Sequence, residues 1–180
     1  MDEKITYFEK PGKENTADVL RLIAERARAR GINKIVLAST RGDTARVAAE
    51  TFEETGFHLV FIPWQYGFRD TQPFSRELVA ELQAKGHRVH FGTMLFHTED
   101  LYGTRTPQVM ANLLRIFGQG IKVCVEIIMM ACDGGCVELD EKVIAVAGSG
   151  AGADTAVVAT ASSSTRMKGL RIHEIICKPL

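Results

Sequence analysis

The sequence predicts an α/β fold in three layers: a doubly wound, mostly parallel sheet between helices, with an antiparallel edge at the C-terminus. Apolar runs of strand length alternate with helical patterns over residues 1–148, as expected for parallel strands joined by crossover helices. Residues 34–38 form a continuous apolar run, which is typical of a strand covered on both faces. No repeat, linker or charge block divides the chain, so a single domain over residues 1–180 is expected.

The first half of the chain contains four strand patterns separated by three helix patterns. The expected strands cover residues 5–8, 34–38, 59–62 and 88–91. Asn15 and Thr16 offer a cap for the first helix, and the third helix is expected to carry Phe74, Leu78 and Leu82 on one face. Each helix ends at a glycine, a residue common just past helix ends; the three are Gly31, Gly56 and Gly86.

The second half begins with a helix signal at Thr106, a capping hydroxyl followed by proline. Val109, Leu113 and Ile116 form an apolar stripe along this helix. Residues 121–132 are apolar nearly all round, which predicts a deeply buried helix that could lie at a subunit interface. A strand is the alternative interpretation of this segment. Three strands are expected at residues 143–147, 155–159 and 172–177, with the first two forming a hairpin.

The composition narrows the classes of partner. The chain has 180 residues, 46% hydrophobic and 24% charged, with 22 basic against 22 acidic side chains. This balance gives no electrostatic reason to expect nucleic acid or an anionic membrane as a partner. The start of the chain lacks the pattern of a secretory signal, and four cysteines are too few for a disulfide framework. A soluble, cytoplasmic protein is expected.

Ligands of open α/β sheets bind at the carboxyl ends of the strands. Residues 39–45 follow the second expected strand with two hydroxyl side chains, a glycine and a third hydroxyl opening a helix. Backbone N–H groups and the positive helix end would converge there on an anion. We therefore predict phosphate binding at this turn, with simple helix capping as the alternative. The candidate residues are Ser39, Thr40, Arg41, Gly42, Asp43 and Thr44.

Residues 148–155 form a second candidate region because their glycines follow another strand end. The spacing of Gly148, Gly150 and Gly152 only superficially resembles a dinucleotide fingerprint, since a strand and not a helix follows. Two interpretations stay open. The segment is either a glycine-rich hairpin or a flexible flap over the ligand, with Ser149, Asp154 and Thr155 among its polar contacts.

Aromatic residues follow the third expected strand, at positions 64, 66 and 68. Trp64, with Gln65 beside it, could stack on a planar ligand, although local packing is the more common explanation of such a cluster. A hydrolase that uses His90 or His97 is a third hypothesis, based only on their position near a strand end. The sequence contains no recognisable catalytic triad, so no catalytic residue is predicted. Lys122 and Glu126 are spaced for an ion pair on one helix face.

Cys132 and Cys136 are interpreted as small core residues, because the other cysteines do not complete a zinc-ligand spacing. No metal site is predicted.

The turn from residue 37 to residue 45 resembles the strand-turn-helix of the pyruvate kinase C-terminal domain, which binds the phosphate of an allosteric effector. Gly42, Thr44 and Ala45 match that pattern, whereas Arg41 stands at its serine position. The whole chain is similar to stand-alone, mainly archaeal proteins with a pyruvate kinase C-terminal-like fold. The supporting segments are residues 106–107, 126–135, 148–156 and 174–179.

This resemblance implies a binder of flavin mononucleotide (FMN) without an established reaction and without pyruvate kinase activity. By position, the phosphate would be held by Ser39, Thr40, Gly42, Asp43 and Thr44, and Gly92, Thr93 and residues 148–155 would border the ribityl chain and ring. The rival hypothesis is a non-catalytic regulatory module that binds a sugar phosphate or nucleotide and acts through oligomerisation. Its motivation is the apolar segment 121–132, which would suit the interface of a homo-oligomer.

Overall fold

The computed structural model describes residues 2–180 and contains a seven-stranded sheet of order β1-β7-β6-β5-β2-β3-β4. All neighbouring strands are parallel except for the two pairs that β6 makes with β5 and β7. The predicted α/β fold with a mostly parallel sheet is confirmed. The antiparallel pairing lies in the C-terminal part of the chain, and β1 adds to β7 at the outside of it.

The strands agree with the sequence patterns in number and order. Their bounds are β1 Thr6–Phe8, β2 Lys34–Ala38, β3 His58–Ile62, β4 Arg88–Val89, β5 Lys142–Ala147, β6 Thr155–Thr160 and β7 Arg171–Pro179. The predicted hairpin is confirmed, since β5 and β6 are antiparallel neighbours. The fourth strand is shorter than predicted: β4 pairs with β3 only through Arg88 and Val89, and the chain then leaves the sheet.

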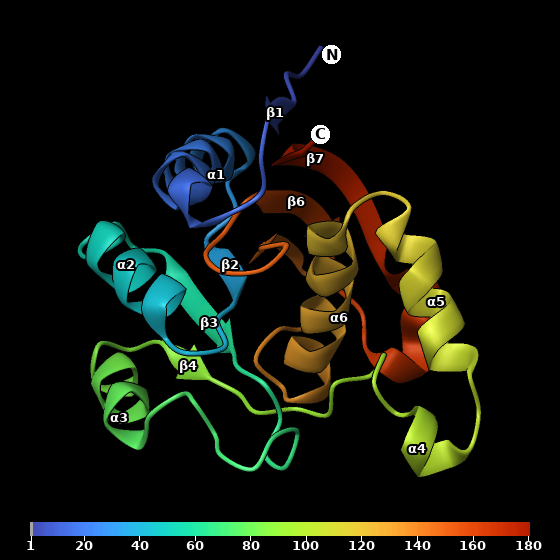
Figure 1. Ribbon diagram of the computed structural model, residues 1–180. Coiled ribbons are helices and arrows are strands. Elements are labelled where there is room, and N and C mark those ends of the chain that lie inside the picture. Colours follow the sequence, from blue (N-terminus) through green and yellow to red (C-terminus); the bar gives the residue numbers. More distant parts are fainter. Residues whose placement is uncertain (1) are drawn as a thin grey trace.

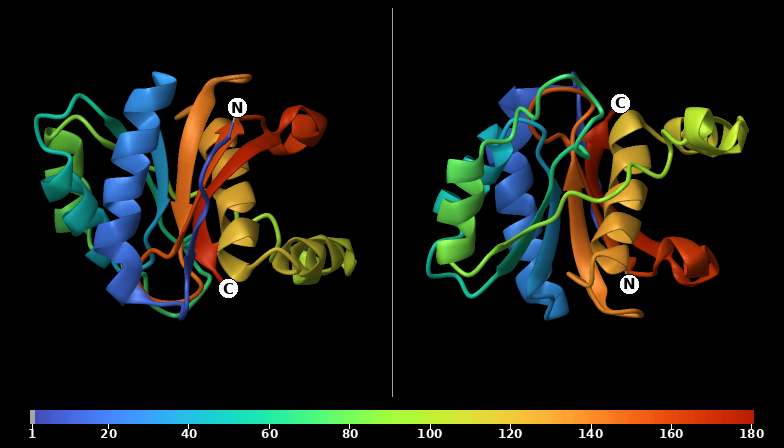
Figure 2. Two further views of the ribbon diagram at one scale, coloured as in Figure 1. Left: turned by 90° about the horizontal axis from the view of Figure 1, so that it is seen from above. Right: turned by 90° about the horizontal axis from the view of Figure 1, so that it is seen from below.

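Helices cover both faces of the sheet, as Figures 1 and 2 show. The helices are α1 Thr16–Arg30, α2 Asp43–Thr51, α3 Arg76–Ala84, α4 Glu99–Tyr102, α5 Thr106–Arg115 and α6 Gln119–Asp133, with the 3₁₀ helices η1 Lys13–Asn15 and η2 Ser164–Gly169. The first three lie on one face, α6 lies on the other, and α5 packs on the outside of α6 (Figure 2). Within residues 2–180, none of the helices is long and apolar enough to cross a membrane.

Alternation along the central strands divides the core. Ile35 and Leu37 of β2 pack under α1 and α2, whereas Val36 between them packs under α6. A third cluster between α5 and α6 includes Ala111 and Met129.

Segment 121–132 lies within helix α6, which settles the choice between strand and helix. Burial extends over most of this helix, including Ile128, which is 0% exposed. The sheet and α5 together provide this burial within one chain. The apolar character of α6 is therefore no evidence of a subunit interface.

Helix α5 turns its predicted apolar stripe to solvent and begins differently from the prediction. Val109, Leu113 and Ile116 of this stripe are 64%, 61% and 75% exposed. The side chain of Thr106 does not cap the helix; Arg105 occupies the N-cap position without a side-chain cap. The neighbouring residues Met110, Ala111 and Leu114 face the core instead.

Two other helix starts also differ from the sequence-based expectation. Asn15 donates its side-chain amide to the Lys10 carbonyl, and the Thr16 hydroxyl accepts from Ala153 N–H, so neither side chain caps α1. Helix α3 begins at Arg76, after Ser75, whose Oγ accepts from Leu78 N–H at 3.2 Å. Phe74 therefore precedes the helix, although it is buried in the core as expected.

Candidate functional site

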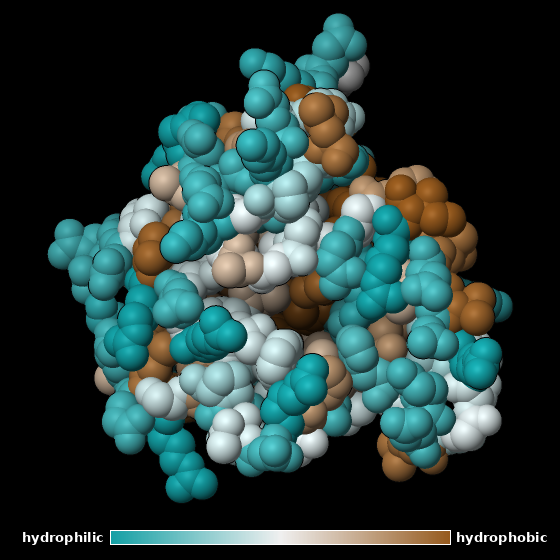
Figure 3. Space-filling model, viewed as in Figure 1, coloured by the Kyte–Doolittle hydropathy of each residue, from teal (hydrophilic) through white to brown (hydrophobic). Residues whose placement is uncertain are grey.

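The carboxyl ends of three adjacent strands meet at one edge of the sheet. Ala38 at the end of β2 pairs with Ile62 at the end of β3, and Leu37 pairs with Val146 of β5. The segments that follow these strands therefore start side by side, and Figure 1 views the molecule from this end. Figure 3, from the same direction, shows a hollow near the centre of this face with hydrophobic residues at its floor.

The turn between β2 and α2 is held by its own hydrogen bonds. Ser39 is buried; its N–H donates to the Ile62 carbonyl at 3.2 Å, and its Oγ accepts from Ala45 N–H at 3.2 Å. Gly42 has φ +96°, and a Cβ there would lie 2.2 Å from Cδ2 of Leu78. The backbone conformation favours glycine at this position, and any larger residue would also require the Leu78 side chain to move.

The same turn presents a row of free donors. In the described part of the chain, the backbone N–H groups of residues 40–44 have no hydrogen-bond acceptor; the first helical bond runs from Arg46 N–H to the Gly42 carbonyl. These groups lie at the positive end of α2. Thr44 is buried, Thr40 is half-buried, and Arg41 and Asp43 are exposed. The geometry suits an anion at this end of the helix.

The glycine-rich segment before β6 is closed by Asp154, which is 0% exposed. Its carboxylate accepts four hydrogen bonds, from the N–H and Oγ of Ser149, the N–H of Gly12 and the Oγ1 of Thr155, at 2.8–3.3 Å. A ligand contact from Asp154 would have to replace one of these bonds. The structure therefore has a compact hairpin that this carboxylate closes.

The start of α1 forms the other wall of this hairpin. A Cβ at Gly152, where φ is +77°, would lie 2.4 Å from Cα of Lys13, and a Cβ at Gly148 would lie 2.2 Å from the Gly152 carbonyl oxygen. Ala153 N–H donates to the Thr16 hydroxyl at 3.0 Å. Sequence reasoning missed residues 12–16 at this end of the sheet, because their hydroxyl and amide side chains were interpreted as helix caps. Gly150 is exposed, with open space where a Cβ would lie.

The aromatic residues after β3 form a connected cluster. Half-buried Trp64 packs edge-on against Phe68, with 5.1 Å between ring centroids, and Phe68 packs in the same way against His97 at 5.3 Å. Gln65 Oε1 accepts from Met94 N–H at 2.6 Å, which joins the segment after β3 to the segment after β4. Exposed Tyr66 packs against Phe91.

Among the residues that the structure describes, no hydrogen bond joins Gly92 or Thr93 to the turn at residues 39–44. A Cβ at Gly92 would lie 2.8 Å from Nε2 of His90 and 3.6 Å from Cβ of Met130, whereas a Cβ at Gly120 would meet Thr155. Met130, the neighbour of Gly92, and Gly120, the neighbour of Thr155, are ten residues apart on α6, which corresponds to about 15 Å along the helix. A ligand that touches both Gly92 and Thr155 would have to span this distance, and Thr93 is exposed.

Sequence reasoning only partly recognised a buried group of charges on α6. The predicted ion pair is present: Lys122 Nζ lies 2.5 Å from Glu126 Oε2, and the two residues are 1% and 3% exposed. His97 Nε2 lies 3.2 Å from the same Nζ, and Phe96 N–H donates to Glu126 Oε1 at 2.9 Å. Burial lowers the pKa of Lys122, and burial together with the Lys122 charge lowers the pKa of His97.

The cysteines are all free thiols. Burial raises the pKa of Cys132 to about 11 and that of Cys177 to about 12, so neither favours the reactive thiolate. Among residues 2–180, no group of three or more His, Cys, Asp or Glu side chains could hold a metal ion.

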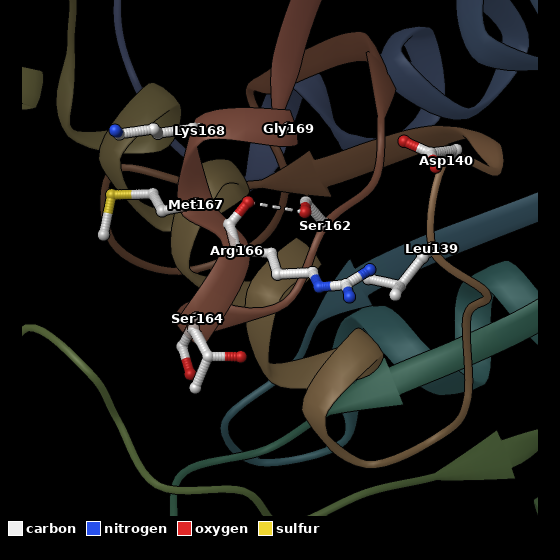
Figure 4. Close-up of a pocket in the computed structure, with 9 residues that line it drawn as sticks. Leu139, Asp140, Ser162, Ser164, Arg166, Met167, Lys168 and Gly169 are labelled. Atoms are coloured by element: carbon white, nitrogen blue, oxygen red, sulfur yellow. Dashed lines mark hydrogen bonds between the residues drawn. The ribbon is translucent and has the colours of Figure 1, made fainter.

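Two surface cavities lie at the opposite end of the sheet. One, of about 580 Å³, is lined by residues 139–140 and by the segment after β6, where Ser162 Oγ donates to the Arg166 carbonyl (Figure 4). The other, of about 370 Å³, lies around Phe57 and His87. Neither is lined by a candidate site residue of the sequence analysis, because both lie at the amino-terminal ends of the parallel strands.

No family model matches the chain. Among solved structures, the chain is similar to a pyruvate kinase from Cryptosporidium parvum, with 16% identity and a TM-score of 0.44 over 81% of this chain and 22% of that one. It is also similar to a structure of Cryptosporidium parvum pyruvate kinase in complex with ADP, with 17% identity and a TM-score of 0.40 over 96% and 25% of the two chains. The chain spans about a quarter of the length of these enzymes or less.

Proposed function

We propose that the protein binds a phosphate-bearing small molecule, with FMN as the leading candidate, at the turn between β2 and α2. The observation that carries this proposal is the row of backbone N–H groups at residues 40–44 without acceptors in the described chain. A phosphate monoester carries nearly two negative charges at neutral pH and offers several acceptor oxygens. It would satisfy these donors at the positive end of a nine-residue helix.

The residues around the turn are suited to the rest of such a ligand. Gly42 keeps the backbone free of a side chain at the closest approach, and Thr40 and Thr44 add hydroxyl groups. Trp64 follows the adjacent strand and is half-buried, so one part of its ring is available to a planar group. Gly148 and Ser149 follow the strand on the other side. When bound, a flavin would supply one- or two-electron transfer chemistry.

The test compares ligands with and without the phosphate. Titration calorimetry with FMN and with riboflavin should show binding of FMN at least about tenfold tighter, since only FMN can use the N–H groups. Equal affinities would argue against phosphate recognition.

A matched pair of charge reversals then locates the site. Arg41→Glu adds a carboxylate within the turn and should weaken FMN binding about tenfold or more by like-charge repulsion. Arg46→Glu makes the same change in charge one helical turn later, where Arg46 has only an exposed ion pair with Glu81, and should change affinity less than about twofold. Gly42→Asp is a poorer variant, because its side chain would collide with Leu78 whether or not a ligand binds.

The second candidate is a regulatory module that binds a sugar phosphate or nucleotide and acts through oligomerisation. The specific observation in its favour is the exposed apolar stripe on α5, at Val109, Leu113 and Ile116. Thermal-shift measurements with sugar phosphates and nucleotides distinguish the two candidates, because a ligand that binds the folded state raises the unfolding temperature. Stabilisation by such a ligand but not by FMN would favour the regulatory module.

A further inference from the structure

Helices α4 and α5 expose a strip of large apolar side chains to solvent. Its members are Leu101, Tyr102, Val109, Leu113, Ile116 and Phe117, each 58–75% exposed. We call these six residues the α4–α5 strip. Figure 3 shows hydrophobic residues at the margin of the molecule over α5 and the turn into α6.

The size of the strip matters. With roughly 100 Å² left open on each of its six side chains, the strip totals about 600 Å², at the upper end of the apolar patches of typical monomers, and a standard interface buries ~800 Å² on each partner. Within residues 2–180, no segment covers it. A surface of this size and composition favours an interface with another protein chain.

The charges near the strip narrow the choice of partner. No acidic residue occurs between Asp100 and Glu126, and Arg115 is bound to Gln119 and Asn112. The exposed face of α5 between Thr106 and Leu113 is uncharged. Between the flanking charges of Arg105 and Arg115, this uncharged stretch can meet its own copy without repulsion between like charges. The zero net charge of the chain adds no repulsion between two copies.

An independent observation concerns the edge of the sheet. Strand β7 has nine residues, but β1 pairs only with its last three, Cys177–Pro179. In the described part of the chain, the first six residues of β7 therefore have a strand neighbour on one side only. An open edge of this length is a template for a strand of another chain. Ile172 packs against the cluster under α5, so the open edge begins next to that helix.

We propose that the α4–α5 strip and the open edge of β7 together form the interface of a two-fold symmetric homodimer. In such a dimer the same patch faces itself, so an apolar helix face meets an apolar helix face and one strand edge meets its own copy in antiparallel orientation. A second copy supplies both kinds of surface at once. This interface does not depend on the phosphate ligand.

Sedimentation velocity of the full chain over ~1–100 µM tests the proposal. Wild-type protein should sediment as a dimer at the upper end of this range. Leu113→Glu combined with Ile116→Glu should raise the dimer dissociation constant at least about 100-fold, because each carboxylate would be buried against apolar side chains. Val47→Glu, at an exposed apolar residue of α2, is the matched control and should sediment as wild type.

A second measurement covers the strand edge. Amide hydrogen exchange of residues 171–176 should be slower in the wild type at high concentration than in the double variant. If the double variant unfolds, Ile116→Lys alone replaces it, since this side chain is 75% exposed. The proposal would be overturned if the wild type is a monomer throughout the concentration range or if the variant dimerises as the wild type does. A monomeric wild type would mean that a different protein covers the α4–α5 strip.

Discussion

Asp154 accepts a hydrogen bond from the backbone N–H of Gly12 at 3.2 Å, across 142 residues of chain. The same carboxylate binds Ser149 and Thr155. One buried side chain thus fixes the hairpin between β5 and β6 against the segment that leads into α1. The rigid wall that results borders the same end of the sheet as the turn at residues 39–44.

The substitution Asp154→Asn should lower the free energy of unfolding by about 2 kcal/mol. The amide that it introduces would face N–H donors, so at least one buried donor would lose its acceptor. Asp70→Asn, at an exposed position, is the control and should change stability by less than about 0.5 kcal/mol. Urea unfolding of the three proteins measures the difference. Equal stability of wild type and Asp154→Asn would contradict the role of this carboxylate.

A double-mutant cycle tests the buried pair of Lys122 and Glu126. Lys122→Met should cost about 3 kcal/mol, because it leaves a buried carboxylate without its partner. Adding Glu126→Gln removes that charge and keeps an oxygen for Phe96 N–H. The double variant should therefore be more stable than the sum of the single effects predicts, by at least about 1 kcal/mol. Strict additivity would show that the two side chains are not coupled.

The lowered pKa of His97 predicts that the stability of the protein depends on pH. Burial and the Lys122 charge lower the pKa of His97 below its ordinary value of about 6.5. The unfolded chain then takes up the proton more readily than the folded one. The free energy of unfolding should therefore fall as the pH drops through about 6.5, and level off below the folded-state pKa.

The substitution His97→Gln should make this decrease shallower between about pH 7.5 and 5.5, measured by urea unfolding at both values. His58→Gln, at an exposed histidine, serves as the control. Identical slopes in wild type and His97→Gln would mean that His97 does not contribute.

Alanine substitutions at two glycines with positive φ distinguish the cost of backbone strain from the cost of a steric collision. Gly31→Ala meets no atom within 4 Å, so it should cost about 1 kcal/mol for the left-handed backbone alone. Gly42→Ala has the same kind of strain and also meets Leu78, so it should cost at least about 1 kcal/mol more. Thermal unfolding of both variants measures this difference. A smaller loss for Gly42→Ala would mean that Leu78 moves aside freely.

The sequence patterns were sufficient for the order of the strands along the chain and for the prediction that the segments following β2, β3 and β5 start at one edge of the sheet. Continuous apolar runs such as residues 34–38 identify buried strands, and parallel pairing brings their ends together. The orientation of α5 could not be predicted in the same way. Val109 and Leu113 have the same spacing as Met110 and Leu114, so periodicity alone does not say which pair faces the core.

The contacts that close the candidate site also escaped prediction. The bond from Gly12 to Asp154 joins residues far apart in sequence, and only the three-dimensional arrangement brings them together. Lys122 and Glu126 were recognised as a pair because their spacing is helical, whereas His97 joins them from a segment without regular structure.

The visible absorbance spectrum of the freshly purified protein, with mass spectrometry of any small molecule released on denaturation, tests the central claim most directly. We expect a yellow protein that releases FMN, held by the N–H groups of residues 40–44. A colourless protein that releases no phosphate compound, and that fails to bind added FMN, would contradict the account.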